Sequence, residues 1–236
     1  KRVLSEAPQI DAAGIADGSV FRSIESYLSD HFPGRELWVG ANAYLENAEG
    51  RGATEDIVRG TDDWLFTAPV SDDRETLWDN MQAITTFAEK QSVPVTMMAV
   101  PSAGAVVADK LPALHLPYPD ADMLEEARRI AGNTLHWVDL YTDFCSAEQP
   151  ERLYYRTDHH WTTEGAYRAY CLLMEEQGQS SVPRDDFTVE QIRDFYGTSY
   201  SKSGLWLTEP DTLELWTGSD IQAVTTVYDA NRADPD

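Results

Sequence analysis

The sequence predicts a mixed α/β fold in which helices cover a mainly parallel sheet. Of its 236 residues, 42% are hydrophobic and 25% are charged, the composition of a globular chain long enough to bury a core. Segments with the apolar spacing of amphipathic helices alternate with apolar runs at 93–100 and 135–141. Nearly continuous apolar runs suit parallel strands covered on both faces, so this alternation indicates α/β layers.

Two amphipathic segments open the chain. Between residues 17 and 45, apolar side chains recur at intervals of three and four, which predicts a helix with one buried face: Phe21, Ile24, Leu28 and Phe32. Pro33-Gly34 breaks this pattern and a second apolar run follows, so an α-hairpin is predicted. We expect residues 1–56 to form an N-terminal helical segment packed on a main domain of residues 57–236.

The main domain begins with a predicted hairpin at residues 57–66, where two β-prone runs flank a Gly-Thr-Asp-Asp centre. Helical spacing returns over residues 77–90 and 120–131. The two apolar runs follow these helices and are the predicted strands of the parallel sheet.

The C-terminal third opens with a predicted helix. Thr162 supplies a hydroxyl cap and Glu164 an acidic group in the first turn, and Gly178 is a stop signal. Beyond it we expect a short helix at 187–195, a loop at 197–204 and a short strand at 213–216. The tail from Ala230 is polar and shows no closing core element.

The charge balance excludes several classes of partner. Eighteen basic residues against forty-one acidic ones give a net charge of −23, which repels nucleic acids and anionic membranes. No apolar stretch approaches the ~18 residues of a membrane span, so this is not an integral membrane domain. The chain starts Lys1-Arg2 without an initiator Met or a signal core. We therefore expect a processed chain, from which an N-terminal anchor has been removed if the gene encodes one.

Cys145 and Cys171 are too few for a disulfide framework and lack the spacing of a zinc or redox site. Two interpretations remain open. The spacing is compatible with one bridge between neighbouring helices, and it is also compatible with two unconnected apolar thiols, which is how buried free cysteines usually behave.

Titratable groups gather at one place, in Tyr154-Tyr155-Arg156-Thr157-Asp158-His159-His160-Trp161-Thr162. Two of the five histidines stand here, directly before a capped helix whose backbone N–H groups suit an oxyanion. One interpretation makes His160 a general base that Asp158 orients. In the other, Asp158 caps the turn while the histidines and Trp161 pack under the helix. The residues alone leave both open.

A third interpretation is a metal site formed by Asp158, His159 and His160. Adjacent side chains point in different directions, and the remaining histidines, His31, His115 and His136, are scattered along the chain. The sequence therefore disfavours a metal, and we expect no cofactor.

The segment Asp158-His159-His160-Trp161, with the residues on either side of it, resembles the signature of the bacterial DHHW protein family. Five further segments agree with this resemblance, which covers nearly the whole chain: Tyr27-Leu28-Ser29-Asp30-His31-Phe32-Pro33-Gly34-Arg35, residues 60–66, Val100-Pro101-Ser102-Ala103, Lys110-Leu111-Pro112, and Asp194-Phe195-Tyr196-Gly197-Thr198-Ser199-Tyr200-Ser201-Lys202-Ser203-Gly204.

That family is similar to the alginate O-acetyltransferase group of SGNH-hydrolase-like proteins, extracytoplasmic enzymes that move or remove acetyl groups on polysaccharides. The resemblance implies a three-layer αβα SGNH-hydrolase-like domain. It also implies that Asp158 orients His160, and that His160 is the base for a serine later in the chain. The resemblance further implies a hydrogen-bonded environment for Trp161, and we expect His159, Trp161, Tyr155 and Arg156 to line the site.

The chain departs from that pattern in one respect. No Gly-Asp-Ser-like segment lies between Trp161 and Asp236, because Gly218-Ser219-Asp220 has another order and Gly197-Thr198-Ser199 lacks the acid. Either the chain ends before the serine, and the domain is then incomplete at its C-terminus, or the protein lacks a serine there.

Ser102 is an upstream alternative nucleophile. It follows the apolar run at 93–100, and the end of such a strand is where α/β sheets place functional residues. Pro101 and Gly104 argue equally for a plain turn.

A hydroxyl-rich aromatic segment supplies candidate glycan contacts: Tyr196, Ser199, Tyr200 and Ser201. The alternative is a solvated loop whose aromatic rings cover the edge of the core.

Two functions follow. The first is an extracytoplasmic O-acyltransferase or acetylesterase acting on envelope or secreted polysaccharide, either secreted or anchored at the bacterial cell surface. The second is a glycan-binding or envelope-scaffolding module that retains the motif for structure.

Overall fold

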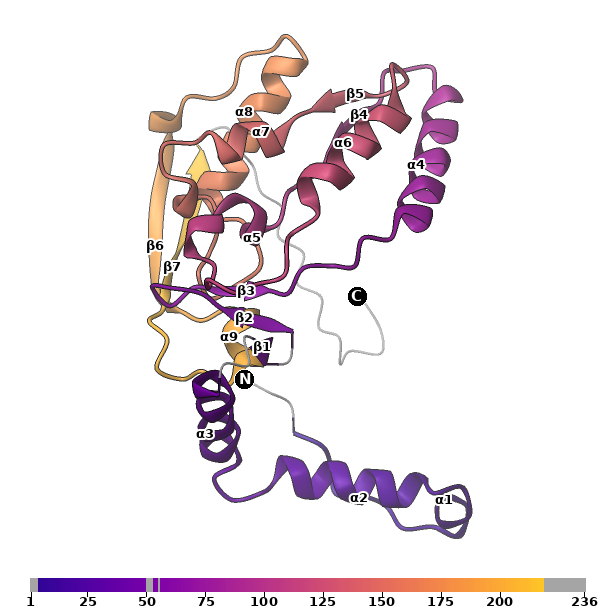
Figure 1. The fold of residues 1–236 in the computed structure, drawn as a ribbon, viewed down its shortest axis with the longest axis vertical. Coiled ribbons are helices and arrows are strands. Elements are labelled where there is room, and N and C mark those ends of the chain that lie inside the picture. Colours follow the sequence, from indigo (N-terminus) through magenta and orange to yellow (C-terminus); the bar gives the residue numbers. More distant parts are fainter. Residues whose placement is uncertain (1–3, 50–52, 55, 219–236) are drawn as a thin grey trace.

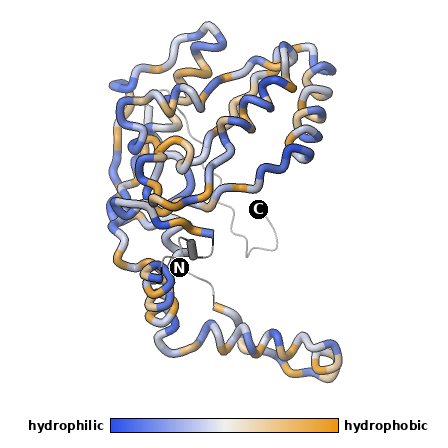
Figure 2. The backbone as a smooth tube through the Cα atoms, viewed as in Figure 1, coloured by the Kyte–Doolittle hydropathy of each residue, from blue (hydrophilic) through white to orange (hydrophobic). Residues whose placement is uncertain are grey.

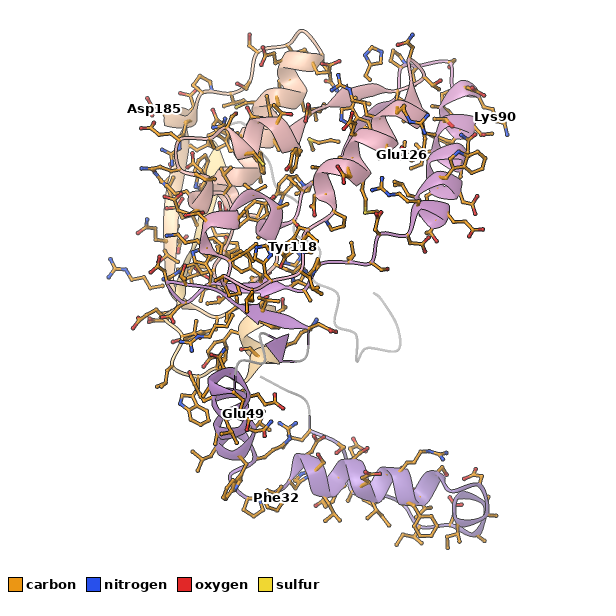
Figure 3. The ribbon with its side chains drawn as sticks, in the orientation of Figure 1. Phe32, Glu49, Lys90, Tyr118, Glu126 and Asp185 are labelled. Carbon is orange, nitrogen blue, oxygen red and sulfur yellow. The ribbon has the colours of Figure 1, made fainter. Side chains whose placement is uncertain are left out.

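The computed structural model describes residues 4–49, 53–54 and 56–218 of the chain. Three helices come first: α1 (Ala12–Asp17), α2 (Ser19–Asp30) and α3 (Arg35–Ala48). Gly34 adopts a left-handed conformation (φ +68°) between α2 and α3, so the predicted break at Pro33-Gly34 is confirmed. Figure 3 shows Phe32 at this turn.

The apolar face predicted to be buried on the first helix is exposed. Phe21 and Leu28 are each 61% exposed, because α1 and α2 extend away from the body of the molecule (Figure 1). Figure 2 shows apolar and polar residues mixed along α2, as the sequence pattern requires. Periodicity specifies which face is apolar, and it does not specify whether a neighbour covers that face.

Helix α3 joins the N-terminal segment to the body. Its Ala43 is buried together with Ile57, Leu65 and Leu205. A Cβ atom at Gly40 would overlap the ring of Trp206, so this glycine allows the indole to lie directly on the α3 backbone.

The first sheet has strands β1 (Ala53–Thr54), β2 (Ile57–Arg59) and β3 (Leu65–Thr67), all antiparallel. Arg59 lies opposite Leu65, which confirms the predicted hairpin. Asp62 and Asp63 in its turn have positive φ angles of 52° and 61°, a conformation that Asp tolerates better than most residues.

The second sheet pairs β4 (Thr96–Met98) and β5 (His136–Val138) in parallel. Helices α4 (Arg74–Glu89) and α6 (Asp120–Ala131) pack on Met97 and Trp137 on one face. On the other face, helices α7 (Leu140–Cys145) and α8 (Thr163–Glu176) share a core cluster with Met98 and Val138. The central unit is therefore three-layered αβα, as expected.

Parallel pairing is confined, in the described residues, to β4 and β5. The crossover between them contains α6, and parallel strands require a connection of this length. The other sheets are antiparallel. They comprise β1–β3 and the pair β6 (Phe187–Phe195) and β7 (Asp211–Gly218).

Two predictions in the C-terminal third are wrong. Residues 187–195 form strand β6 and not a short helix, because β-branched Thr188, Val189 and Ile192 favour a strand and β7 supplies the partner. Residues 198–203 form helix α9 (Thr198–Ser203) and not a loop. Gly204 ends this helix with a φ of +69°.

The remaining elements are short. Strand β5 ends three residues earlier than predicted, because the Asp139 carboxylate accepts the Thr142 N–H (3.1 Å) and starts α7. One more α-helix and three 3₁₀ turns complete the described fold: α5 (Ala103–Val106), η1 (Ala108–Lys110), η2 (Pro150–Arg152) and η3 (Arg184–Asp186).

Cys145 and Cys171 are both free thiols, so the bridge is absent. Within the described ranges, no helix has the length and apolar character needed to cross a bilayer. The tail from Ala230 lies outside the described residues.

Candidate active site

Residues 154–161, the motif loop, form a narrow turn. Tyr154 and Trp161 pair as an isolated antiparallel bridge, and the Tyr155 N–H donates to the His160 carbonyl (3.2 Å). The pairing closes the base of the loop and leaves residues 156–159 at its tip. Thr162 caps α8, as predicted, because its hydroxyl accepts the Gly165 N–H (3.2 Å).

Asp211, the first residue of β7, anchors the tip of the loop. Its Oδ2 accepts both the N–H (2.8 Å) and the hydroxyl (2.6 Å) of Thr157, and its Oδ1 accepts the Arg156 N–H (3.1 Å). Thr157 is fully buried and its hydroxyl also accepts the Gly197 N–H (3.0 Å). Sequence reasoning missed Asp211, which carries no motif and lies about fifty residues from the loop it fixes.

Asp158 is buried and fully hydrogen-bonded. Its Oδ1 accepts the backbone N–H (2.9 Å) and the Nδ1–H (2.5 Å) of His160. Its Oδ2 accepts the N–H (2.6 Å) and the hydroxyl (3.0 Å) of Thr198, at the start of α9. Burial raises the pKa of Asp158, and these hydrogen bonds outweigh burial and hold the pKa below its ordinary value.

The pair fixes the imidazole of His160. A carboxylate can only accept, so Nδ1 of His160 carries the proton and Nε2 keeps its lone pair. The His160 side chain is 65% exposed. A buried anion and an exposed imidazole with a free Nε2 are the arrangement of a general base and its orienting acid.

The two histidines open onto a cavity of about 670 Å³. Its walls come from β3 and the segment 68–70, from α4 and α6, and from β4 and the segment 99–104 that follows it. They are mostly apolar, and Trp161 lies beside the histidines. The His159 Nδ1 lies 2.8 Å from the Thr198 hydroxyl, and its ring centroid is 3.9 Å from that of His160.

Ser102 lines the same cavity as His160. The Asp120 carboxylate accepts its N–H (2.6 Å) and its hydroxyl (3.0 Å), which is a paired arrangement at the end of β4. The Tyr154 hydroxyl donates to the Pro101 carbonyl (2.6 Å), so the motif loop is bonded directly to the segment that carries Ser102.

Tyr155, at the base of the loop, and Arg156, at its tip, do not line this cavity. The ring of Tyr155 packs against Phe195 (5.3 Å between centroids). The Arg156 guanidinium donates to the Pro210 carbonyl (2.9 Å) and lies 3.6 Å from Asp211. Both residues hold the loop in place.

The residues proposed to contact a glycan separate into two environments. Tyr196 and Tyr200 form a ring pair (4.3 Å between centroids), and Tyr196 is exposed. Ser199 is fully buried, with no partner for its hydroxyl among the described residues. The Ser201 hydroxyl donates to the Gly197 carbonyl (3.0 Å) within α9.

Asp158, His159 and His160 also place one potential metal-ligating atom each within 4.8 Å of the others. However, both oxygens of Asp158 accept hydrogen bonds, and Nδ1 of His160 is used to make one of them. A metal bound here would have to replace these bonds, so the arrangement fits an Asp–His pair better than a metal centre.

Residues 57–206 match the family model described as SGNH hydrolase-like domain, acetyltransferase AlgX. The chain belongs to this family. The matched residues include the motif loop and α9, and therefore both sides of the Asp158 hydrogen-bond network.

A curated relative is the probable alginate O-acetylase AlgJ of Pseudomonas syringae pv. tomato, 28% identical over 169 residues. The match covers 64% of this chain and 41% of that protein, so the chain spans less than half of that relative.

Two solved structures share the fold. A DHHW family protein from Eubacterium siraeum is 24% identical, with a TM-score of 0.58 over 71% of this chain and 56% of its own. The O-acetyltransferase domain of Pseudomonas putida AlgJ is 22% identical, with a TM-score of 0.53 over 70% and 66%. The SGNH-hydrolase-like fold and the resemblance to these groups are therefore confirmed.

Proposed function

We propose that the chain carries the Asp–His half of a serine O-acyltransferase or acetylesterase that acts on polysaccharide outside the cytoplasm. Its family and the relative named as an alginate O-acetylase support the acyl chemistry and a polysaccharide acceptor. The observation that carries the proposal is the 2.5 Å contact between the Asp158 carboxylate and Nδ1 of His160.

Each group has a defined role in the proposed reaction. A serine oxygen attacks the acyl carbonyl while Nε2 of His160 takes the hydroxyl proton. The imidazolium then returns this proton to the leaving group as the C–O bond breaks. Asp158 holds the ring and stabilises its positive charge. The serine is not identified in this chain, and no metal or organic cofactor takes part.

The domain division and the location belong to the same proposal. Residues 1–56 form the helical segment and residues 57–236 the SGNH-like domain, which the match beginning at residue 57 supports. An acceptor polysaccharide of the envelope lies outside the cytoplasmic membrane, so we place the protein there, secreted or anchored.

Replacing the base tests the proposal. His160→Ala in the full-length protein should lower turnover of a chromogenic acetyl ester by about a hundredfold to ten-thousandfold, the usual contribution of a general base. His159→Ala is the matched control, because it removes the adjacent imidazole and leaves the Asp158–His160 contact intact. Unchanged turnover in His160→Ala would refute the assignment.

A glycan-binding module without catalysis is the second candidate. The exposed ring of Tyr196, paired with the half-buried ring of Tyr200, favours it, because aromatic faces stack on sugar rings. This function predicts saccharide binding that survives His160→Ala and no ester turnover by the wild-type protein.

A further inference from the structure

The cavity beside His160 has an unusual charge pattern. Among the described residues that line it, Asp120 is the only one with a formal charge, and none is Lys or Arg. The rest of the wall is mostly apolar, and it includes Met81 on α4, Met97 on β4 and Met123 on α6. Any group that enters therefore meets apolar side chains, the hydroxyl groups of Thr67, Ser102, Tyr118 and Tyr154, two imidazoles and one carboxylate.

Asp120 is fixed in this position. It is the first residue of α6, and both of its oxygens accept hydrogen bonds from Ser102, at 2.6 and 3.0 Å. The carboxylate cannot swing into solvent without breaking both bonds, so its charge stays at the cavity wall.

Together with burial, the negative charge of Asp120 raises the pKa of neighbouring tyrosine side chains. Burial, and then the charge of Asp120, raise the pKa of Tyr118 to about 12. The same two causes raise the pKa of Tyr154. Tyr118 and Tyr154 both line the cavity, and Figure 3 labels Tyr118 near the centre of the body.

Cations near the motif loop are already paired. Arg156 faces Asp211, and Nζ of Lys110 lies 2.8 Å from Asp62. A bound carboxylate would need a free Arg or Lys to replace its hydration, and the lining residues that the structure describes include neither. At longer range the net charge of −23 also opposes a polyanion.

We propose that the glycan unit that enters this cavity is uncharged, and that Asp120 excludes sugars bearing a carboxylate. This inference rests on the proposed function and adds to it a class of acceptor. It separates the chain from a relative named for alginate, which is a polymer of uronates. The acceptor is then a neutral hexose or N-acetylhexosamine polymer.

A pair of oligomers that differ in the charge of each carboxyl group, and in the methyl group that removes this charge, tests the inference. Binding of hexagalacturonate and of its fully methyl-esterified form to the full chain is measured by calorimetry. We expect the ester to bind at least about tenfold more tightly. The comparison is repeated in about 1 M salt, where the Debye length falls to about 3 Å and distant charges no longer contribute.

In high salt, Asp120→Asn should reduce the ratio of the affinities of the ester and the acid forms roughly fivefold, the effect of removing one nearby unit charge. Asp122→Asn makes the same change of net charge on the same helix, away from the cavity, and should leave the difference unchanged. Ester binding that persists in Asp120→Asn shows that the cavity has kept its shape.

Val100→Arg provides an independent variant, because Val100 lines the cavity and is exposed. It should strengthen binding of the acid form. Equal binding of the two oligomers to the wild-type chain would overturn the inference, as would absence of binding by both. A difference in affinity between the acid and the ester forms that neither Asp120→Asn nor Val100→Arg alters would also overturn the inference. Failure of the proposed function is distinct, because it appears as ester turnover that does not depend on His160.

Discussion

At the scale of single residues, the site depends on how Asp158 is held. Four hydrogen bonds to a buried carboxylate keep it ionised and keep it pointed at His160. Two of them come from Thr198, which follows Asp158 by forty residues, so the carboxylate proposed to orient His160 is itself oriented by a distant segment. A motif of adjacent residues is completed here by long-range contacts.

Asp158→Asn should make this dependence measurable. Because the folded-state pKa of Asp158 is lowered, the unfolded chain binds more protons as the pH falls through its ordinary range. The contribution of the carboxylate to stability is therefore present above about pH 4 and lost below it. The variant should lower the free energy of unfolding by about 1 to 3 kcal/mol at pH 7.

Urea denaturation of both proteins at several pH values checks this sign. The two curves should converge as the pH falls below about 4. Asp122→Asn, on exposed surface, is the control and should show no such convergence. If the difference in free energy of unfolding between the wild-type protein and Asp158→Asn stayed constant with pH, the ionised carboxylate of Asp158 would not be the source of this stability.

At the scale of elements, local patterns predicted those segments whose partners lie nearby in the chain. Helices α4, α6 and α8 and the hairpin at residues 57–66 follow apolar spacing, caps and turn residues that the sequence displays. Strand β6 was missed because its stability comes from β7, which local spacing does not reveal. Helix α9 was missed because Ser-, Gly- and Tyr-rich segments are typical of loops.

The candidate site likewise contains residues that the sequence pattern indicated and residues that only the fold brings together. The adjacency of Asp158 and His160 was visible in the sequence, and the structure places the two side chains in contact. The supporting groups, Thr198 and Asp211, are distant in the chain and ordinary in type. No pattern of spacing could have indicated them without the fold.

Gly197 shows how α9 is docked onto the loop. A Cβ atom there would lie 2.3 Å from the Cβ of Asp158 and 2.7 Å from the carbonyl oxygen of Thr157. Gly197→Ala should therefore push α9 away from Asp158, weaken the Thr198 hydrogen bonds and cost about 1 to 3 kcal/mol of stability. Ester turnover should fall with it.

Gly178→Ala is the matched control for this change. Its φ of +66° makes alanine unfavourable, but no atom lies within 4 Å of the added Cβ. It should lower stability and leave turnover of the folded enzyme unchanged. Turnover and thermal unfolding of both variants separate the two effects. Normal turnover in Gly197→Ala would show that α9 docking does not position Asp158.

At the scale of the whole molecule, two features extend beyond the Asp158–His160 pair. The family match ends at residue 206, whereas Asp211, which anchors the motif loop, lies beyond it in β7. Helix α2 presents exposed apolar residues away from the body (Figure 1). The described fold thus supports a formed Asp–His pair, to which the proposed reaction adds a serine nucleophile.

Active-site labelling tests most directly whether His160 activates a serine. The full-length protein and its His160→Ala variant are treated with a fluorophosphonate, which forms a stable adduct with an activated serine, and the adduct is located by mass spectrometry. We predict one modified serine in the wild-type protein and loss of labelling in His160→Ala. Absence of any adduct, or equal labelling of both proteins, would contradict the assignment of His160 as the base that activates a serine.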